Sequence, residues 1–266
     1  MIVISKVSPF VLALWVLVAA LGVRAEAGAF LLEPGQWQVI STMRLSASRL
    51  KYDGSGRPQP EPLYRKTETS TLIEYGLNRD VTLMLVPTGR HVAMEGPPAA
   101  EAWNIGSLDV GARWRVHDFG ASVVSFQGLV RVPARSDPAF LPENRGRSEL
   151  RLGLGRSGLS WLGRDGFADL GMAWVKRNDP WPDEMRADVT LGWWQFPDQL
   201  VLMQWFQTYY PTAPGQLHTP SQTKFEASTV SKLGQGWSLQ LGSFASIGGV
   251  STRYERGTVI GLWRKF

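Results

Sequence analysis

The chain of 266 residues contains no cysteine. Disulfides, thiol catalysis and cysteine-held metal sites are therefore excluded. Histidine is scarce too, with three residues, and no group of histidine or acidic residues has the spacing of a zinc or calcium site. We accordingly predict no metal, no cofactor and no catalytic residues.

The three histidines leave little room for hydrolytic chemistry. A serine hydrolase needs an imidazole placed to take the proton of the hydroxyl. His91 is followed by Val-Ala and His117 by Asp-Phe, and only His218 has a serine, Ser221, close behind it. We interpret His218 as a solvated loop residue and predict that the protein is not an enzyme. A lipid-modifying barrel enzyme is the third alternative.

Beyond the N-terminal region the sequence has no long apolar run. No stretch there reaches the ~18 consecutive apolar residues that a membrane-spanning helix needs. At the N-terminus, Lys6 precedes an apolar run of 14 residues, 10–23, and small residues follow at Ala25 and Ala27. This pattern predicts a secretory signal peptide over residues 1–25, cleaved after Ala25 or Ala27. The mature chain, 26–266, is long enough for one large β domain.

Charge of one sign is not in large excess. Without Lys6 and Arg24, 26 basic residues stand against 23 acidic ones. This excess is too small to indicate a nucleic-acid partner, and we predict none.

What the chain does contain is alternation with a period of two, which predicts β-strands through nearly all of the mature sequence. In 107–116 (SLDVGARWRV), apolar residues alternate with Ser, Asp, Gly and Arg, and 148–155 and 186–193 repeat the pattern. The runs are about as long as the tilted strands of 9–11 residues that cross a bilayer. Soluble sandwiches use strands of about 5–6 residues. A secreted β-sandwich is therefore the second choice.

The spacing predicts twelve strands joined by alternately long and short connections. The short ones include 78–80, 118–120, 197–199 and 234–236, whereas the long ones are rich in Pro and Gly, as in 54–60. Residues 158–165 are an exception, because a longer connection is expected there at a place where the alternation calls for a short turn. The expected strands are 36–48, 65–77, 81–92, 104–117, 121–132, 146–158, 166–177, 185–196, 200–210, 222–233, 237–246 and 253–266.

These features predict an all-β fold, a transmembrane antiparallel β-barrel of about 12 strands with short periplasmic turns and longer outer loops. Both termini then lie in the periplasm, and outer-membrane lipids surround the wall. The 12 tryptophans fit aromatic girdles at the membrane interfaces. If the Leu, Val and Trp residues face lipid, the alternate positions place charges of both signs in the lumen. These candidate lumen charges are Glu68, Glu74, Asp109, Arg113, Arg115, Arg131, Glu149, Arg151, Arg186, Asp188 and Glu226.

The last ten residues, GTVIGLWRKF, continue the alternation to the terminal Phe266. With Thr258, Ile260 and Leu262 on its face, this end resembles the C-terminal signal that the barrel-assembly machinery of Gram-negative bacteria reads. Several stretches, 28–36, 64–69, 74–77, 129–133 and 254–257, are similar to the small proteobacterial barrel proteins of the XagA-like group. That resemblance implies an outer-membrane location, no established reaction, and a link of some relatives to surface polysaccharide.

Two interpretations of the lumen stay open. Paired interior charges fill a narrow barrel and hold it shut, or they form a charged constriction that selects small or anionic solutes. Twelve strands give a lumen between filled eight-stranded barrels and open porins. We therefore predict a narrow channel or accessory transport protein, with a structural or adhesive membrane protein without a pore as the alternative.

Overall fold

The computed structural model describes residues 28–96, 99–132, 146–161, 163–178, 182–211 and 219–266. It contains twelve strands: β1 (Trp37–Tyr52), β2 (Pro58–Asn78), β3 (Val81–Met94), β4 (Ala100–Asp118), β5 (Ser122–Val132), β6 (Arg147–Trp161), β7 (Arg164–Arg177), β8 (Glu184–Phe196), β9 (Gln199–Tyr209), β10 (Ser221–Gly234), β11 (Trp237–Val250) and β12 (Arg256–Lys265). In these ranges no helix is long and apolar enough to cross a membrane. The predicted signal peptide lies outside the described residues.

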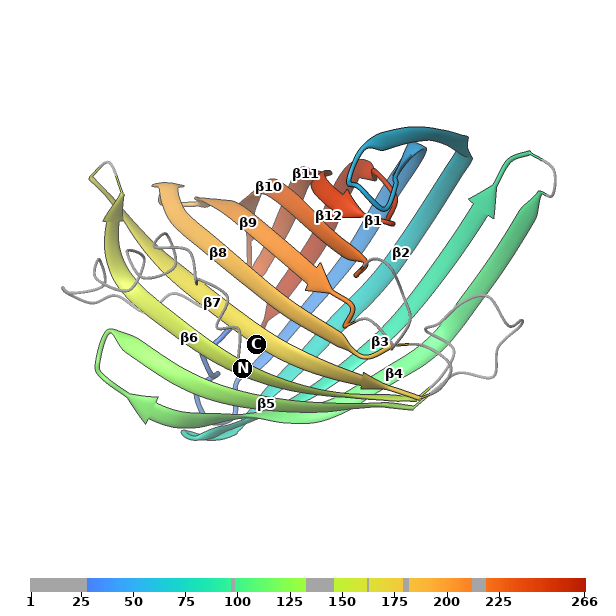
Figure 1. Ribbon diagram of the computed structural model, residues 1–266. Helices are drawn as coiled ribbons and strands as arrows, with labels where there is room; N and C mark the ends of the chain where they lie inside the picture. The colour runs from blue at the N-terminus through green and yellow to red at the C-terminus, as the bar shows by residue number, and fades with distance from the viewer. Residues whose placement is uncertain (1–27, 97–98, 133–145, 162, 179–181, 212–218) are drawn as a thin grey trace, which may run out of the picture.

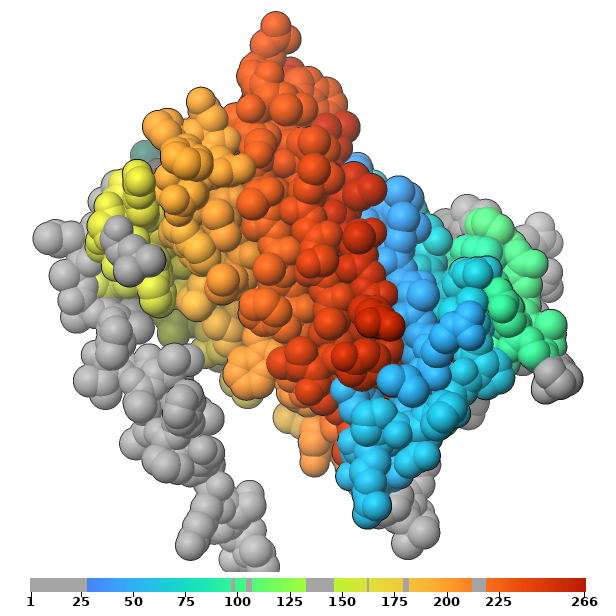
Figure 2. Space-filling model, turned by 90° about the horizontal axis from the view of Figure 1, so that it is seen from above, coloured from blue at the N-terminus to red at the C-terminus, as the bar shows by residue number. Residues whose placement is uncertain are grey.

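Every strand pairs antiparallel with its sequence neighbours, and β12 pairs with β1, so the sheet is a closed barrel. The closing ladder runs from Gln38 opposite Lys265 to Ala47 opposite Arg256. Beyond it, the Phe266 N–H donates to the Trp37 carbonyl at 3.0 Å. The blue β1 and the red β12 lie side by side in Figure 1, and Figure 2 shows the two meeting on the outer wall. The predicted fold class is confirmed, and the two-sheet sandwich is excluded.

The connections alternate between two ends of the barrel, which we call the short-turn end and the long-loop end. At the short-turn end, Arg79–Asp80 and Pro197–Asp198 are two-residue turns. The expected long connection at 158–165 is wrong. A register shift between Arg156 and Leu159 lets β6 continue to Trp161, and β7 begins at Arg164. The expected loop 49–64 is likewise shorter, because β1 and β2 extend to Tyr52 and Pro58.

The apolar residues of the alternating pattern face outward. Leu150 and Leu152 of β6 are each more than half exposed on the outer wall, whereas Glu149, next to Leu150 in sequence, faces inward and is 5% exposed. Large aromatic residues gather near the two strand ends, as in a pair of interfacial girdles. Exposed members are Trp37, Phe119, Trp161, Phe196, Trp237 and Phe266 toward the short-turn end, and Trp103, Trp174, Trp205 and Tyr209 toward the long-loop end.

Candidate functional site

The inner face of the barrel gains apolar residues toward the short-turn end. On β2 the inward residues run from Lys66 and Glu68, toward the long-loop end, through Ser70 to Leu72 and Glu74. Two adjoining cavities lie along this face. We call the one toward the long-loop end the outer basin and the one toward the short-turn end the inner chamber.

The outer basin is a cavity of about 900 Å³ with a basic lining. Its charged lining residues are nine basic ones, Arg44, Lys66, Arg90, Arg131, Arg147, Arg177, Arg186, Lys224 and Arg253, and three acidic ones, Glu68, Glu184 and Glu255. Four more carboxylates, Glu61, Asp109, Glu149 and Glu226, pair with basin cations from behind the lining. Nine cations against seven anions leave the basin moderately positive, which favours anions inside it.

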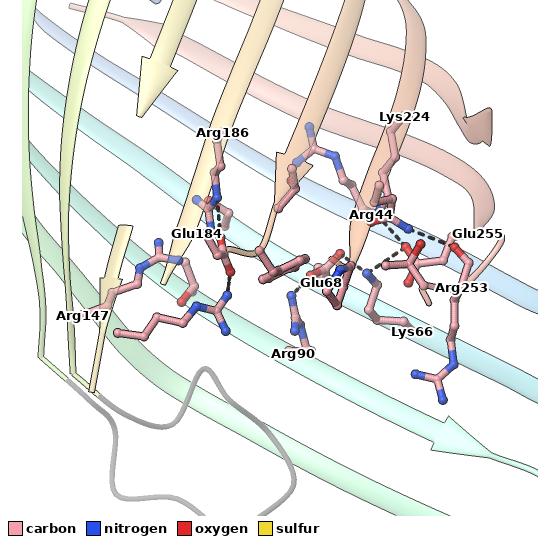
Figure 3. Close-up of a pocket in the computed structure, with 18 of the residues that line it drawn as sticks. Arg44, Lys66, Glu68, Arg90, Arg147, Glu184, Arg186, Lys224, Arg253 and Glu255 are labelled. Carbon is pink, nitrogen blue, oxygen red and sulfur yellow. Dashed lines mark hydrogen bonds and ion pairs between the residues drawn. The ribbon is translucent and has the colours of Figure 1, made fainter. Parts of the chain in front are cut away.

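One chain of ion pairs runs along the inner face of the barrel from β2 to β10. Lys66 Nζ lies 2.9 Å from Glu68 and 3.0 Å from Glu255, and Lys224 Nζ lies 2.7 Å from Glu255. Figure 3 shows these side chains pointing toward one another in the basin. Glu255 precedes β12, outside the strands. Burial alone would raise the pKa of its carboxyl, but the two ammonium groups outweigh burial and lower that pKa to about 2.

A second cluster centres on Asp109 of β4. Its carboxylate accepts two bonds from Arg131 of β5, at 2.7 and 2.8 Å, and one from Arg147 of β6, at 2.9 Å. The Asp109 and Arg131 side chains are 4% and 5% exposed. A bidentate arginine pair of this geometry fixes both groups and satisfies charges that water does not reach.

A third cluster joins β6, β7 and β8. Arg151 of β6 reaches across β7 to Asp188 of β8, with contacts of 2.7 and 2.9 Å. Arg186 contacts Glu149 at 3.2 Å and Glu184 at 2.5 Å, and Arg177 also pairs with Glu184. The contacts of Arg151 with Asp188 and of Arg186 with Glu149 connect β6 with β8, two strands that share no backbone ladder.

Arg44 of β1 marks the boundary between the two cavities, since it and Ser70 line both. Its Nε–H donates to Glu226 of β10 at 3.3 Å. The Glu226 side chain is 2% exposed, but that of Arg44 is 35% exposed to the cavities. The arginine therefore presents its charge to both cavities.

The inner chamber is a cavity of about 320 Å³ with a mixed lining. Polar and charged residues such as Gln38, Glu74 and Thr190 line it together with apolar residues from β1, β2, β7, β9 and β12. The apolar lining residues are Ile40, Leu72, Phe167, Leu200, Leu202, Phe206 and Trp263. Phe167, Leu200 and Leu202 belong to a buried cluster with Val230, against which Trp194 and Trp263 pack. The lumen therefore has an apolar level as well as a charged one.

Residues 28–36, which we call the N-terminal segment, enter the barrel from the short-turn end and line the inner chamber. The Ala29 N–H donates to Asp169 at 2.5 Å, the Leu32 N–H to Thr82 at 3.1 Å, and Arg113 donates to the Phe30 carbonyl at 2.8 Å. Ala29 and Leu32 are 2% and 6% exposed. The segment thus covers part of the lumen at this end.

The structure distributes the candidate lumen charges over three levels. Glu68, Asp109, Arg131, Glu149, Arg186 and Glu226 lie in or behind the outer basin, and Glu74, Arg113, Arg151 and Asp188 lie at the inner chamber or pair there. Arg115 lies near the short turn after β4, where it contacts Asp118 at 2.6 Å. On the candidate assembly signal, Thr258, Ile260, Leu262 and Phe266 are exposed on the outer wall.

Sequence reasoning missed several residues of the site. They are Arg44, Arg90, Arg147, Arg177, Glu184 and Asp169, together with the apolar lining residues of the inner chamber and the N-terminal segment. For Arg44 a signal existed, because it shares its strand face with Gln38 and Ser46, which are buried. For the N-terminal segment no local pattern exists, since its contacts come from distant strands.

The histidines do not assemble a reaction centre among the described residues. His91 stacks on Trp103 at 3.8 Å between ring centroids and contacts Glu101 at 2.8 Å, on the outward side of β3 and β4. Ser221 begins β10, and His218 lies outside the described residues. No group of three His, Asp or Glu residues within the described ranges could hold a metal ion.

Comparison with known proteins identifies relatives in fold. No protein-family model and no curated protein matches the chain. Among solved structures it is similar to an outer membrane channel from Pseudomonas putida F1, at 14% identity and a TM-score of 0.74, over 91% of this chain and 100% of that one. It is also similar to the translocator domain of the autotransporter NalP from Neisseria meningitidis, at 12% identity and a TM-score of 0.51, over 88% of this chain and 90% of that one. The chain therefore has the fold of outer-membrane β-barrels.

Proposed function

We propose that this protein is a narrow outer-membrane channel that admits small anionic solutes. The observation that carries the proposal is the outer basin, a cavity of about 900 Å³ with nine basic and three acidic lining residues. A cavity lined by an excess of one charge concentrates solutes of the opposite charge. The similarity in fold to an outer membrane channel supports the same function.

The proposed orientation places the short turns and both termini in the periplasm and the outer basin toward the cell surface. Outer-membrane barrels have short periplasmic turns and longer outer loops. Phe266, exposed at the end of the closing strand, is proposed as part of the signal for the barrel-assembly machinery. Deleting it should lower the folded fraction in the outer membrane, and Lys265→Gln should leave that fraction unchanged. A link to surface polysaccharide rests only on the resemblance to the XagA-like group.

The decisive measurement is the reversal potential of the purified protein in a planar bilayer under a KCl gradient. We expect discrete conductance steps and a preference for chloride over potassium. Arg44→Gln and Arg253→Gln should each reduce that preference, because both side chains line the basin and are about 36% exposed. Arg65→Gln is the matched control, since Arg65 is 63% exposed and pairs with Glu95 at the surface.

A structural barrel without a pore is the second candidate. It is favoured by the ion pairs that cross the inner wall and by the N-terminal segment within the lumen. The two candidates differ in one outcome. A protein that shifts on gels when boiled, as folded barrels do, but gives no conductance steps would support the structural barrel.

A further inference from the structure

We infer that the boundary between the outer basin and the inner chamber is a binding site for an amphipathic carboxylate, with its head group at Arg44 and its apolar tail in the inner chamber. The inference rests on the proposed channel function and names its solute class. It begins with the order of residues along the strands. On β1, the inward side chains pass from Arg44 through Thr42 to Ile40. Four strand residues span roughly 13 Å, enough for a medium-length tail.

The adjacent strand β2 repeats this order. Opposite Arg44 lies Glu68, and opposite Ile40 lies Leu72, which Glu74 follows on the same face. On β9, Thr208 lines the outer basin, whereas Phe206, Gln204 and Leu202 line the inner chamber. A change toward apolar residues on three strands matches a ligand that is itself charged at one end and apolar along the rest.

The head-group site has the donors that a carboxylate needs. Arg44 gives its Nε–H to Glu226, and a guanidinium carries four further N–H groups in a planar fork that suits carboxylates. Lys66 and Lys224 line the same basin, and Figure 3 shows Lys224 beside Arg44. An anion held here keeps its charge paired, which burial requires.

The inner chamber supplies the apolar part. Leu202 is 4% exposed and Phe167 is 2% exposed, and both face a cavity of about 320 Å³. That volume lies near the lower end of the ~300–1,000 Å³ range of small-molecule sites. Its charged residues face their own partners: Asp188 contacts Arg151, Glu74 contacts Arg113, and Asp169 accepts the Ala29 N–H. The chamber therefore favours a tail over a second charged group.

The test uses the full protein in lipid nanodiscs and a decanoic acid analogue with a diazirine near its tail end. After illumination, mass spectrometry locates the labelled residues. We expect label on the chamber-lining peptides that contain Leu72 or Leu202. Unlabelled decanoate should compete with the label, whereas acetate, which has no tail, and decanol, which has no charge, should compete at least about tenfold less well, as expected when a charge-assisted hydrogen bond or an apolar contact is lost.

Two variants probe the two parts of the site. Arg44→Gln should reduce labelling about tenfold through loss of the charged contact. Leu202→Gln should reduce it as well, with Leu72→Gln as the substitute if Leu202→Gln fails the gel-shift test for a folded barrel. Lys232→Gln is the control, because Lys232 is basic but contacts Asp198 and the Pro197 carbonyl near the short turns.

The outcomes separate this inference from the channel itself. Label confined to lipid-facing residues such as Leu241 and Ile260, label unaffected by Arg44→Gln, or equal competition by acetate would each overturn the inference. If conductance and chloride preference persist in that case, the channel stands without this ligand. Chamber labelling in a protein that does not conduct would leave the binding site and remove the channel.

Discussion

Arg151 and Asp188 meet directly over Gly171, on the strand that separates them. The contacts from Arg151 Nη1 measure 2.7 and 2.9 Å, and a Cβ added to Gly171 would lie 2.0 Å from that nitrogen. The glycine leaves the space through which the ion pair crosses β7. Its role is to allow a close approach, since its backbone does not need a positive φ.

Replacing Gly171 with alanine should therefore destabilise the barrel by about 1–3 kcal/mol, because the arginine must shift or lose its partner. The measurement is the free energy of unfolding in lipid vesicles, followed by tryptophan fluorescence. Gly128→Ala is the matched control, since a Cβ there would make ordinary contacts with the Trp114 ring at 3.6 Å and with Leu150 at 3.9 Å. Equal effects of the two substitutions would contradict the assigned role.

Removing the Asp109 carboxylate should lower the free energy of unfolding more than removing one member of an exposed ion pair. Asp109→Asn leaves Arg131 and Arg147, with side chains 5% and 18% exposed, without their anion, and we expect a loss of about 3 kcal/mol. The exposed pair gives the control: Arg65→Gln should change the free energy of unfolding by less than about 1 kcal/mol. The double variant Asp109→Asn/Arg131→Gln should recover part of the loss. An additive double variant would show that the two side chains do not interact.

The N-terminal segment should limit conductance. Because the chain has no cysteine, Ala29→Cys with Gly153→Cys introduces a single pair. A Cβ on Gly153 would lie 3.0 Å from that of Ala29, about 0.8 Å closer than the mean in ordinary disulfides, so the segment must shift slightly to form the bond. We expect lower and quieter single-channel currents in the oxidised form and recovery after reduction. Each single-cysteine variant serves as a control, and identical currents in both redox states would show that the segment does not limit flow.

The Glu255 cluster should contribute to stability down to low pH. The folded-state pKa of Glu255, about 2, lies below its ordinary value of 4.5, so the contribution is fully present above pH 4.5 and is lost as the pH falls toward 2. The difference in thermal midpoint between the wild type and Glu255→Gln should be constant above pH 5 and shrink below about pH 4. Glu95→Gln is the control, since Glu95 is 56% exposed. A difference that grows on acidification would contradict the assigned pairing.

The architecture was predictable because the alternation of strand residues and the residues of the turns can both be recognised in short stretches of sequence. Most strands alternate, and the short connections carry turn residues, so the number and order of the strands follow from the sequence. The strand ends lie within about four residues of the expected ones, except that β2 begins at Pro58 and not at residue 65. The loop expected at 158–165 was wrong because a β-bulge depends on how two strands pair, which the sequence of one strand does not show. Gly158 and Gly163 adopt positive φ values of 67° and 73°, which glycine allows but does not by itself predict.

The apolar level of the lumen was not predictable in the same way. In β9, QLVLMQWFQTY, apolar residues occupy both faces, so a period of two does not distinguish the lipid side from the lumen side. The structure assigns Leu200 and Leu202 inward and Met203 and Trp205 outward. The ion pairs were predictable as a set of inward charges, but their partners depend on which strands the barrel brings within reach.

The N-terminal segment also sets an order of events during assembly. It contacts Gly76 of β2, Thr82 of β3, Arg113 of β4 and Asp169 of β7, a residue 140 positions from Ala29. Contacts so far apart in sequence form late, since the intervening chain must first be ordered. The hydrogen bond between Ala29 and Asp169 therefore forms only once β7 has joined the sheet. A segment that precedes the first strand in sequence thus reaches its full set of contacts after much of the barrel wall is in place.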